Sequence, residues 1–318
     1  MRSSARPPLD GAVMTGGLYT AGTYGGLYSE GRFALERANI ENAALDARVL
    51  LQHATRRSWA EVFEDEAEIA APGEIAAFNE MIARRVAHEP VAQIIGAKEF
   101  WSLEFKVTPA TLIPRPESEH LVERALELIP RNSHGRVLDL GTGTGCLLIS
   151  LLKERTHMTG LGVDISAEAL EVAKSNAISS AVVQRCAFVQ SDWTENVVGE
   201  FDLVLANPPY LTEEEFESAA PEVRDHEPRL ALTPGTDGLA AYEAIAKGLT
   251  KVLTPGGFAV LELGIDQARR VHALLKSAGL DSIGIGLDLA GRERVISGRK
   301  PIGSKGLAAA KKRLESAP

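Results

Sequence analysis

Four consecutive residues, Asn207-Pro208-Pro209-Tyr210, have the chemistry to hold a planar nitrogen group. They follow residues 201–206, a mostly apolar run that is typical of a buried strand. Proline has a fixed φ and no backbone N–H, so Pro208 and Pro209 end the strand in a stiff turn that is rich in carbonyl acceptors. With the side-chain oxygen of Asn207, these carbonyls suit a carboxamide or an exocyclic amine, and Tyr210 could stack on its plane. A sharp turn without a chemical role would use the same residue types, so the motif does not decide alone.

A glycine-rich segment lies upstream, after a short apolar strand predicted for residues 136–140. The segment consists of Gly141, Thr142, Gly143, Thr144 and Gly145, and an apolar helix is predicted to begin directly after it. A strand, a glycine turn and a helix in this order are typical of nucleotide sites in doubly wound folds, because glycines let the backbone come close to the ligand.

Two further predicted strands end in acidic residues. Residues 159–163 lead into Asp164, at about the separation from the glycine turn that is expected of a carboxylate on ribose hydroxyls. Residues 187–190 lead, through a serine, into Asp192 and Trp193. The order of glycine turn, Asp, Asp-Trp and Asn-Pro-Pro-Tyr resembles that of S-adenosylmethionine-dependent amino-methyltransferases.

The resemblance implies a cofactor site at these strand ends. Residues 141–145 would pass under the methionine part of S-adenosylmethionine, and Asp164 would hold the ribose. Asp192 and Trp193 would belong to the same site, with Trp193 near the adenine, and Asn207 would lie beside the cofactor as well.

Composition restricts the class of protein. The chain has 318 residues, of which 45% are hydrophobic and 24% charged, which is ordinary for a globular protein with one large core and a small second domain. No apolar run is long enough to span a membrane, and the amino terminus lacks a signal-peptide pattern. The two cysteines are far apart and the seven histidines are scattered, so neither a disulfide framework nor a metal site is predicted. We therefore expect a cytoplasmic enzyme that needs no metal.

The charge distribution argues against a nucleic-acid partner. The net charge is −9, whereas affinity for a polyanion requires basic surface. Residues 211–229, directly after the Asn-Pro-Pro-Tyr turn, carry seven acidic residues and only two arginines. Such a rim would repel a polyanion and tolerate a basic protein surface. A solvated loop and helix face would look the same, so this alternative stays open.

The chain is predicted to consist of five parts. Residues 1–32, rich in Gly, Ser, Tyr and Pro, are expected to form a flexible extension. Residues 33–92 have helical periodicity and form a small helical domain that would dock a substrate. Residues 93–112 alternate as a β-hairpin linker, with Gly96 in the turn, residues 113–303 form the catalytic domain, and residues 304–318 are a tail.

A narrower resemblance covers residues 35–300. The segments Glu89-Pro90-Val91-Ala92-Gln93-Ile94-Ile95-Gly96 and Ile113-Pro114-Arg115-Pro116-Glu117 are similar to those of peptide chain release factor glutamine-N5 methyltransferases, the HemK/PrmC family. Ser118 stands where threonine is expected. The resemblance implies an α/β fold, with a Rossmann-like seven-stranded methyltransferase domain behind the helical domain and the hairpin. Arg115, fixed between two prolines, could line the mouth of the site and contact the substrate, or it could only fix the start of the following helix.

The expected reaction is methyl transfer to the side-chain amide nitrogen of the glutamine in the Gly-Gly-Gln motif of class-1 release factors, leaving S-adenosylhomocysteine. Acceptors from Asn207 and Pro208 on the two N–H bonds would align the poorly nucleophilic amide with the methyl group. Three alternatives remain open: a glutamine methyltransferase of a ribosomal protein, a nucleic-acid adenine-N6 methyltransferase, and a non-catalytic module that only binds S-adenosylmethionine.

Overall fold

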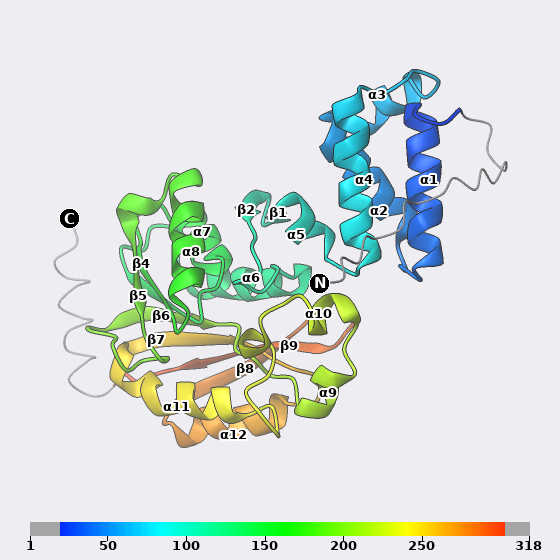
Figure 1. Cartoon of the computed structure of the whole chain (residues 1–318). Helices are drawn as coiled ribbons and strands as arrows, with labels where there is room; N and C mark the ends of the chain where they lie inside the picture. The colour runs from blue at the N-terminus through cyan, green and yellow to red at the C-terminus, as the bar shows by residue number, and fades with distance from the viewer. Residues whose placement is uncertain (1–19, 303–318) are drawn as a thin grey trace, which may run out of the picture. The chain divides into compact units, whose positions relative to one another are not determined.

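The computed structural model describes residues 20–302, and the chain divides between Ile95 and Gly96 into two compact units (Figure 1). Residues 1–19 of the predicted extension and the whole of the predicted tail, residues 304–318, lie outside the described residues. No helix within the described range is long and apolar enough to cross a membrane.

The amino-terminal unit is built from five helices among the residues described: α1 (Tyr24–Arg37), α2 (Ala43–Thr55), α3 (Trp59–Glu64), α4 (Pro72–Val86) and α5 (Val91–Ile95). The helices α1, α2 and α4 contact one another around a core that includes Leu35, Leu51 and Phe78, all of them buried. The periodic apolar residues of these helices thus meet in one cluster, as amphipathic helices require.

The start of α1 corrects the predicted boundary of the extension. Residues 24–32, assigned to a flexible segment, belong to a helix whose N-cap is Thr23, with the Thr23 hydroxyl accepting from the Gly26 N–H at 3.1 Å. The glycines that suggested flexibility allow close packing instead. A Cβ added at Gly31 would lie 2.5 Å from Cζ of Phe78, so only glycine lets α1 approach α4 at this point.

The second unit opens with an antiparallel hairpin of β1 (Ala97–Phe100) and β2 (Leu103–Lys106). Its turn is formed by Trp101 and Ser102, both with positive φ, and not by Gly96 as the sequence suggested. Gly96 precedes β1, and its carbonyl accepts from the Val107 N–H at 3.0 Å, so Gly96 closes the open end of the hairpin.

A seven-stranded sheet forms the body of this unit, as the sequence predicted (Figure 1). Its strands are β3 (Arg136–Leu140), β4 (Thr159–Asp164), β5 (Cys186–Gln190), β6 (Phe201–Ala206), β7 (Leu253–Glu262), β8 (Asp281–Leu287) and β9 (Glu293–Arg299). The spatial order is β5-β4-β3-β6-β7-β9-β8, with β3 to β7 parallel and β9 antiparallel to both of its neighbours.

Helices cover both faces of the sheet. On one side lie α6 (Glu119–Leu128), α7 (Cys146–Glu154) and α8 (Ala167–Ser179), and on the other α11 (Ala240–Val252) and α12 (Ala268–Ser277) (Figure 1). Successive strand residues point to opposite faces, so Leu138 packs toward α11 and α12 while Val137 packs toward α6 and α7. The short elements η1 (Pro116–Ser118), η2 (Val183–Arg185), α9 (Glu213–Glu217), α10 (Pro221–Arg224) and η3 (Arg229–Ala231) complete the unit.

Candidate active site

The strand order brings the four strand ends singled out in the sequence to one edge of the sheet. The chain runs outward from β3 through β4 to β5 and then returns to place β6 on the other side of β3. The last residue of β3, Leu140, pairs with both Val163 and Ala206, so the glycine turn lies between Asp164 and Asn207. In open α/β sheets, ligands bind where the strand order reverses in this way, at the carboxyl ends of the strands.

The glycine turn has a backbone that other residues adopt poorly. Gly141, Gly143 and Gly145 have φ values of +71°, +53° and +80°. The N–H groups of Gly141 and Thr142 both donate to the Val163 carbonyl at 2.9 Å, which fixes the turn against β4. Because left-handed φ disfavours residues that carry a Cβ, the alternating glycines are required for this shape.

Two carboxylates hold the turn from either side. Asp164 accepts from the N–H groups of Gly143 at 2.9 Å and Ser166 at 3.0 Å, and burial raises its pKa. Asp139, inside β3, is fully buried and accepts from the Thr142 hydroxyl at 2.7 Å. Burial raises the pKa of Asp139 to about 7. The sequence analysis did not single out Asp139; an acid inside an otherwise apolar strand, two residues before a glycine turn, was the available signal.

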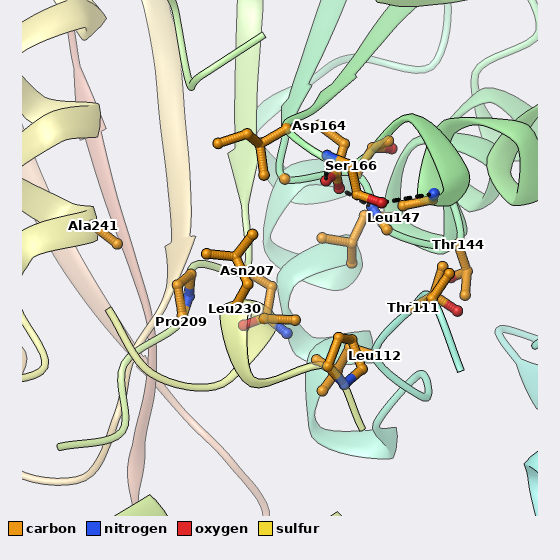
Figure 2. A pocket seen from close by; sticks show the side chains of 18 of the residues that line it. Thr111, Leu112, Thr144, Leu147, Asp164, Ser166, Asn207, Pro209, Leu230 and Ala241 are labelled. Carbon is orange, nitrogen blue, oxygen red and sulfur yellow. Dashed lines mark hydrogen bonds between the residues drawn. The ribbon is translucent and has the colours of Figure 1, made fainter. Parts of the chain in front are cut away.

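A cavity of about 540 Å³ opens in front of these strand ends, a volume in the range of small-molecule and cofactor sites. Four of the five residues of the turn line it, all except Gly145. The lining also includes Asp164, Asp192, Trp193 and Asn207. Figure 2 shows Asp164 and Ser166 on one side of this cavity and Asn207 and Pro209 across from them. Gly145 lies behind the turn, where it is the N-cap of α7.

The indole of Trp193 lies against the glycine turn. A Cβ added at Gly141 would be 3.5 Å from the Trp193 ring, so the ring lies within the reach of a methyl group from the turn. Trp193 and the half-exposed Ile165 contribute apolar surface to the cavity, and Asp164 contributes a carboxyl group.

A second, smaller cavity of about 140 Å³ adjoins the first on the far side of Asn207. All four residues of the Asn-Pro-Pro-Tyr turn line it, together with Leu112 and Arg115. The two cavities share Asn207 and Pro209 among their lining residues. Asn207 and Pro209 therefore belong to the lining of both cavities, as do Leu112, Arg115 and Ala231.

The side chains of the turn are held by residues that sequence reasoning missed. Asn207 Nδ2 donates to Ser118 Oγ at 3.1 Å, and Tyr210 donates its hydroxyl to Glu262 at 3.2 Å. Burial and the nearby Glu262 charge raise the pKa of Tyr210, which keeps its hydroxyl protonated. Gln267 donates to the Tyr210 carbonyl at 2.9 Å. No local pattern could reveal these contacts, because their partners lie 52 to 89 residues away in sequence.

Arg115, expected on the substrate side, lines both cavities and forms an ion pair with Glu227 at 2.5 Å. Glu227 is buried and also accepts from the Ile113 N–H at 3.0 Å. This carboxylate ties the segment after the Asn-Pro-Pro-Tyr turn to the loop that carries Arg115. One acid of the predicted acidic rim is therefore internal, and Arg229 is paired with Glu213 and Glu217 on the surface.

Within residues 20–302, no group of three or more His, Cys, Asp or Glu side chains lies close enough together to hold a metal ion.

Comparisons with known proteins agree with this geometry. Two family models match the chain, a PrmC N-terminal domain over residues 27–96 and a methyltransferase small domain over residues 120–226. The release factor glutamine methyltransferase of Cereibacter sphaeroides is 45% identical over 267 residues, which cover 84% of this chain and 95% of that protein. The protein of the same name from Caulobacter vibrioides is 41% identical, with 84% of this chain and 92% of the relative covered.

Among solved structures, the catalytic domain of hMettl16 in complex with the MAT2A 3′UTR hairpin 6 has a TM-score of 0.52 at 15% identity. The match covers 69% of this chain and 81% of that one, and it shows a shared fold.

Proposed function

The chain belongs to the family of release factor glutamine methyltransferases, and from this premise we propose that it methylates a release factor. The methyl group of S-adenosylmethionine would pass to N5 of the glutamine in the Gly-Gly-Gln motif of a class-1 peptide chain release factor, and S-adenosylhomocysteine would be released. Since release factors act at the ribosome, we place this reaction in the cytoplasm.

The residues of the large cavity fit the cofactor. S-adenosylmethionine has a flat base, a ribose with two adjacent hydroxyls and a flexible amino-acid part. Trp193 and Ile165 offer apolar walls for a base, and Asp164 has lone pairs beyond the two bonds it accepts from backbone N–H groups. Gly141 and Gly143 bring backbone without a side chain to the lining of the cavity. When bound, the cofactor supplies a sulfonium-activated methyl group as the electrophile.

The single observation that carries the proposal is the position of Asn207 in the wall between the two cavities. An amide nitrogen is a weak nucleophile, so the acceleration of its methylation must come largely from alignment with the methyl group. The Asn207 side-chain oxygen and the Pro208 carbonyl can accept both N–H bonds of a carboxamide that enters the smaller cavity. Its nitrogen would then face the larger one. The methylated amide can release its proton to water, so the site needs no dedicated base.

The substrate would be a protein. The acidic residues of α9 lie in the segment directly after the Asn-Pro-Pro-Tyr turn, which disfavours a polyanionic substrate and so argues against adenine methylation of a nucleic acid. We propose that the helical unit contributes by contacting the folded part of the release factor, which lets the enzyme select a whole protein by more than one loop.

Asn207→Ala tests the chemical role of the turn. This variant should still bind S-adenosylmethionine but lose methyl transfer to an intact release factor by about 100-fold or more, because a buried N–H loses its acceptor and the alignment suffers. Asn132→Ala, an exposed asparagine in the turn that precedes β3, is the matched control and should transfer at the wild-type rate. Near-normal turnover of Asn207→Ala would show that the acceptor turn does not align the substrate.

A further inference from the structure

A chain of hydrogen bonds leads from Asn207 into the interior of the second unit. Asn207 Nδ2 donates to Ser118 Oγ at 3.1 Å, and the Ser118 hydroxyl donates to Glu262 Oε2 at 2.5 Å. The other carboxylate oxygen of Glu262 accepts from the Tyr210 hydroxyl at 3.2 Å. These hydrogen bonds therefore connect the side chains of Asn207 and Tyr210, the first and last residues of the Asn-Pro-Pro-Tyr turn, to the carboxylate of Glu262.

The three elements that supply these groups are firmly placed. Glu262 is the last residue of β7, and the neighbouring Leu261 pairs with Ala206 at the end of β6, directly before Asn207. Ser118 ends η1 and precedes α6, which packs on the sheet. Ser118 is 2% exposed and Glu262 1% exposed, so water does not compete for the bond between these two residues.

The number of protons that each group can donate fixes the direction of these hydrogen bonds. The Glu262 carboxylate, when ionised, accepts from the hydroxyls of both Ser118 and Tyr210, so the single hydroxyl proton of Ser118 is committed to Glu262. The Ser118 oxygen can then only accept from Asn207, which requires the NH2 end of the amide to face Ser118. If the amide were turned over, two acceptor oxygens would face each other and the Asn207 NH2 group would lose this partner, which disfavours that orientation.

We propose that Ser118, oriented by Glu262, is a positioning residue that fixes which end of the Asn207 amide is presented to the substrate. With its NH2 group held by Ser118, Asn207 presents Oδ1 as the acceptor for an N–H of the target carboxamide. In the reverse orientation, the NH2 group of Asn207 would face the N–H of the target carboxamide, and two donors cannot form a hydrogen bond. The role assigned to the substrate rests on the proposed function, whereas the orientation of Asn207 is a property of the chain alone.

The kinetic test compares Ser118→Ala with Ser118→Thr. Ser118→Ala should lower kcat about fivefold, because the amide loses its preferred orientation and some of its alignment, while cofactor affinity stays the same. Ser118→Thr keeps the hydroxyl and should recover most of that loss. In an Asn207→Ala background, Ser118→Ala should have no further effect, because Ser118 acts only through Asn207. Equal fold losses in both backgrounds would overturn the proposal.

A spectroscopic test reads the orientation in the free protein and does not depend on any substrate. In a ¹⁵N-correlated NMR spectrum, the side-chain NH2 signal of Asn207 is identified by its absence in Asn207→Ala. One of its protons should be shifted by the bond to Ser118 and protected from exchange in the wild type and in Ser118→Thr. Both properties should be lost in Ser118→Ala. An unchanged signal in Ser118→Ala would overturn the proposal. This test does not depend on the proposed function, because it can be read even if the wild-type protein does not methylate a release factor.

Discussion

The buried carboxyl group of Asp139 should make the stability of this protein depend on pH. Asp139 lies inside β3 with no exposed surface, and its one side-chain hydrogen bond among the described residues comes from Thr142. Burial raises its pKa to about 7, and the nearby Asp164 carboxylate adds to this effect. Asp139→Asn keeps an oxygen for Thr142 to donate to, but it cannot ionise.

The sign of the effect follows from the two states of the chain. Below pH 4, Asp139 is protonated in both the folded and the unfolded protein and contributes nothing. Between about pH 4 and pH 7, the unfolded chain releases the proton while the folded protein keeps it, so stability falls as pH rises. Above pH 7 both states are ionised and the penalty is constant. From pH 5 to pH 8 the loss attributable to Asp139 should reach about 3 kcal/mol, at about 1.4 kcal/mol per pH unit up to the folded pKa.

The assay is equilibrium unfolding in urea at several pH values between 5 and 8, for the wild type and Asp139→Asn. The difference between the two proteins removes the contributions of all other titrating groups. We expect the stability of Asp139→Asn relative to the wild type to increase by about 3 kcal/mol between pH 5 and pH 8. Parallel curves, with the same difference in stability at every pH, would refute the claim that a buried Asp139 retains its proton.

Further predictions concern the glycine turn, the cofactor and the contacts of Glu227 with Arg115 and Ile113. Gly143→Ala should cost about 1 kcal/mol of stability through its left-handed φ alone. Gly145→Ala should cost about 1 kcal/mol more, because its Cβ would lie 2.9 Å from the buried Ile149 side chain and 3.3 Å from Cβ of Ala173. Equal costs in urea unfolding would contradict this. Asp164→Ala should weaken S-adenosylmethionine binding about tenfold or more in calorimetry, and wild-type affinity would remove Asp164 from the cofactor site. Glu227→Ala should lower the free energy of unfolding by about 3 kcal/mol, since Arg115 and the Ile113 N–H lose a buried partner. A change below about 1 kcal/mol would show that these two contacts of Glu227 contribute little to stability.

The sequence predicted the strand ends well because each depends on a local pattern. Apolar runs of four to six residues, interrupted by glycine, proline or aspartate, mark where strands stop. The parallel arrangement then brings their carboxyl ends to one edge. That is why Asp164, Trp193 and Asn207 line one cavity although more than forty residues separate the first from the last.

The supporting residues were beyond such patterns. Ser118 meets Glu262 across 144 residues, and Ile113 meets Glu227 across 114. Both contacts depend on the strand order and on how the loops return over the sheet edge, which periodicity does not encode. The misplaced start of α1 has a different cause: glycines lower helix propensity, but Gly31 packs against Phe78, and tertiary packing outweighs propensity.

Transfer of labelled methyl groups in a mixture of candidate substrates tests the proposed activity most directly. The enzyme is incubated with labelled S-adenosylmethionine, an intact class-1 release factor, ribosomal proteins and adenine-containing DNA, and the modified residue is mapped by mass spectrometry. We predict label on the release factor alone, at N5 of the glutamine in its Gly-Gly-Gln motif. Label on a ribosomal protein or on the DNA, with none on the release factor, would contradict the proposed function.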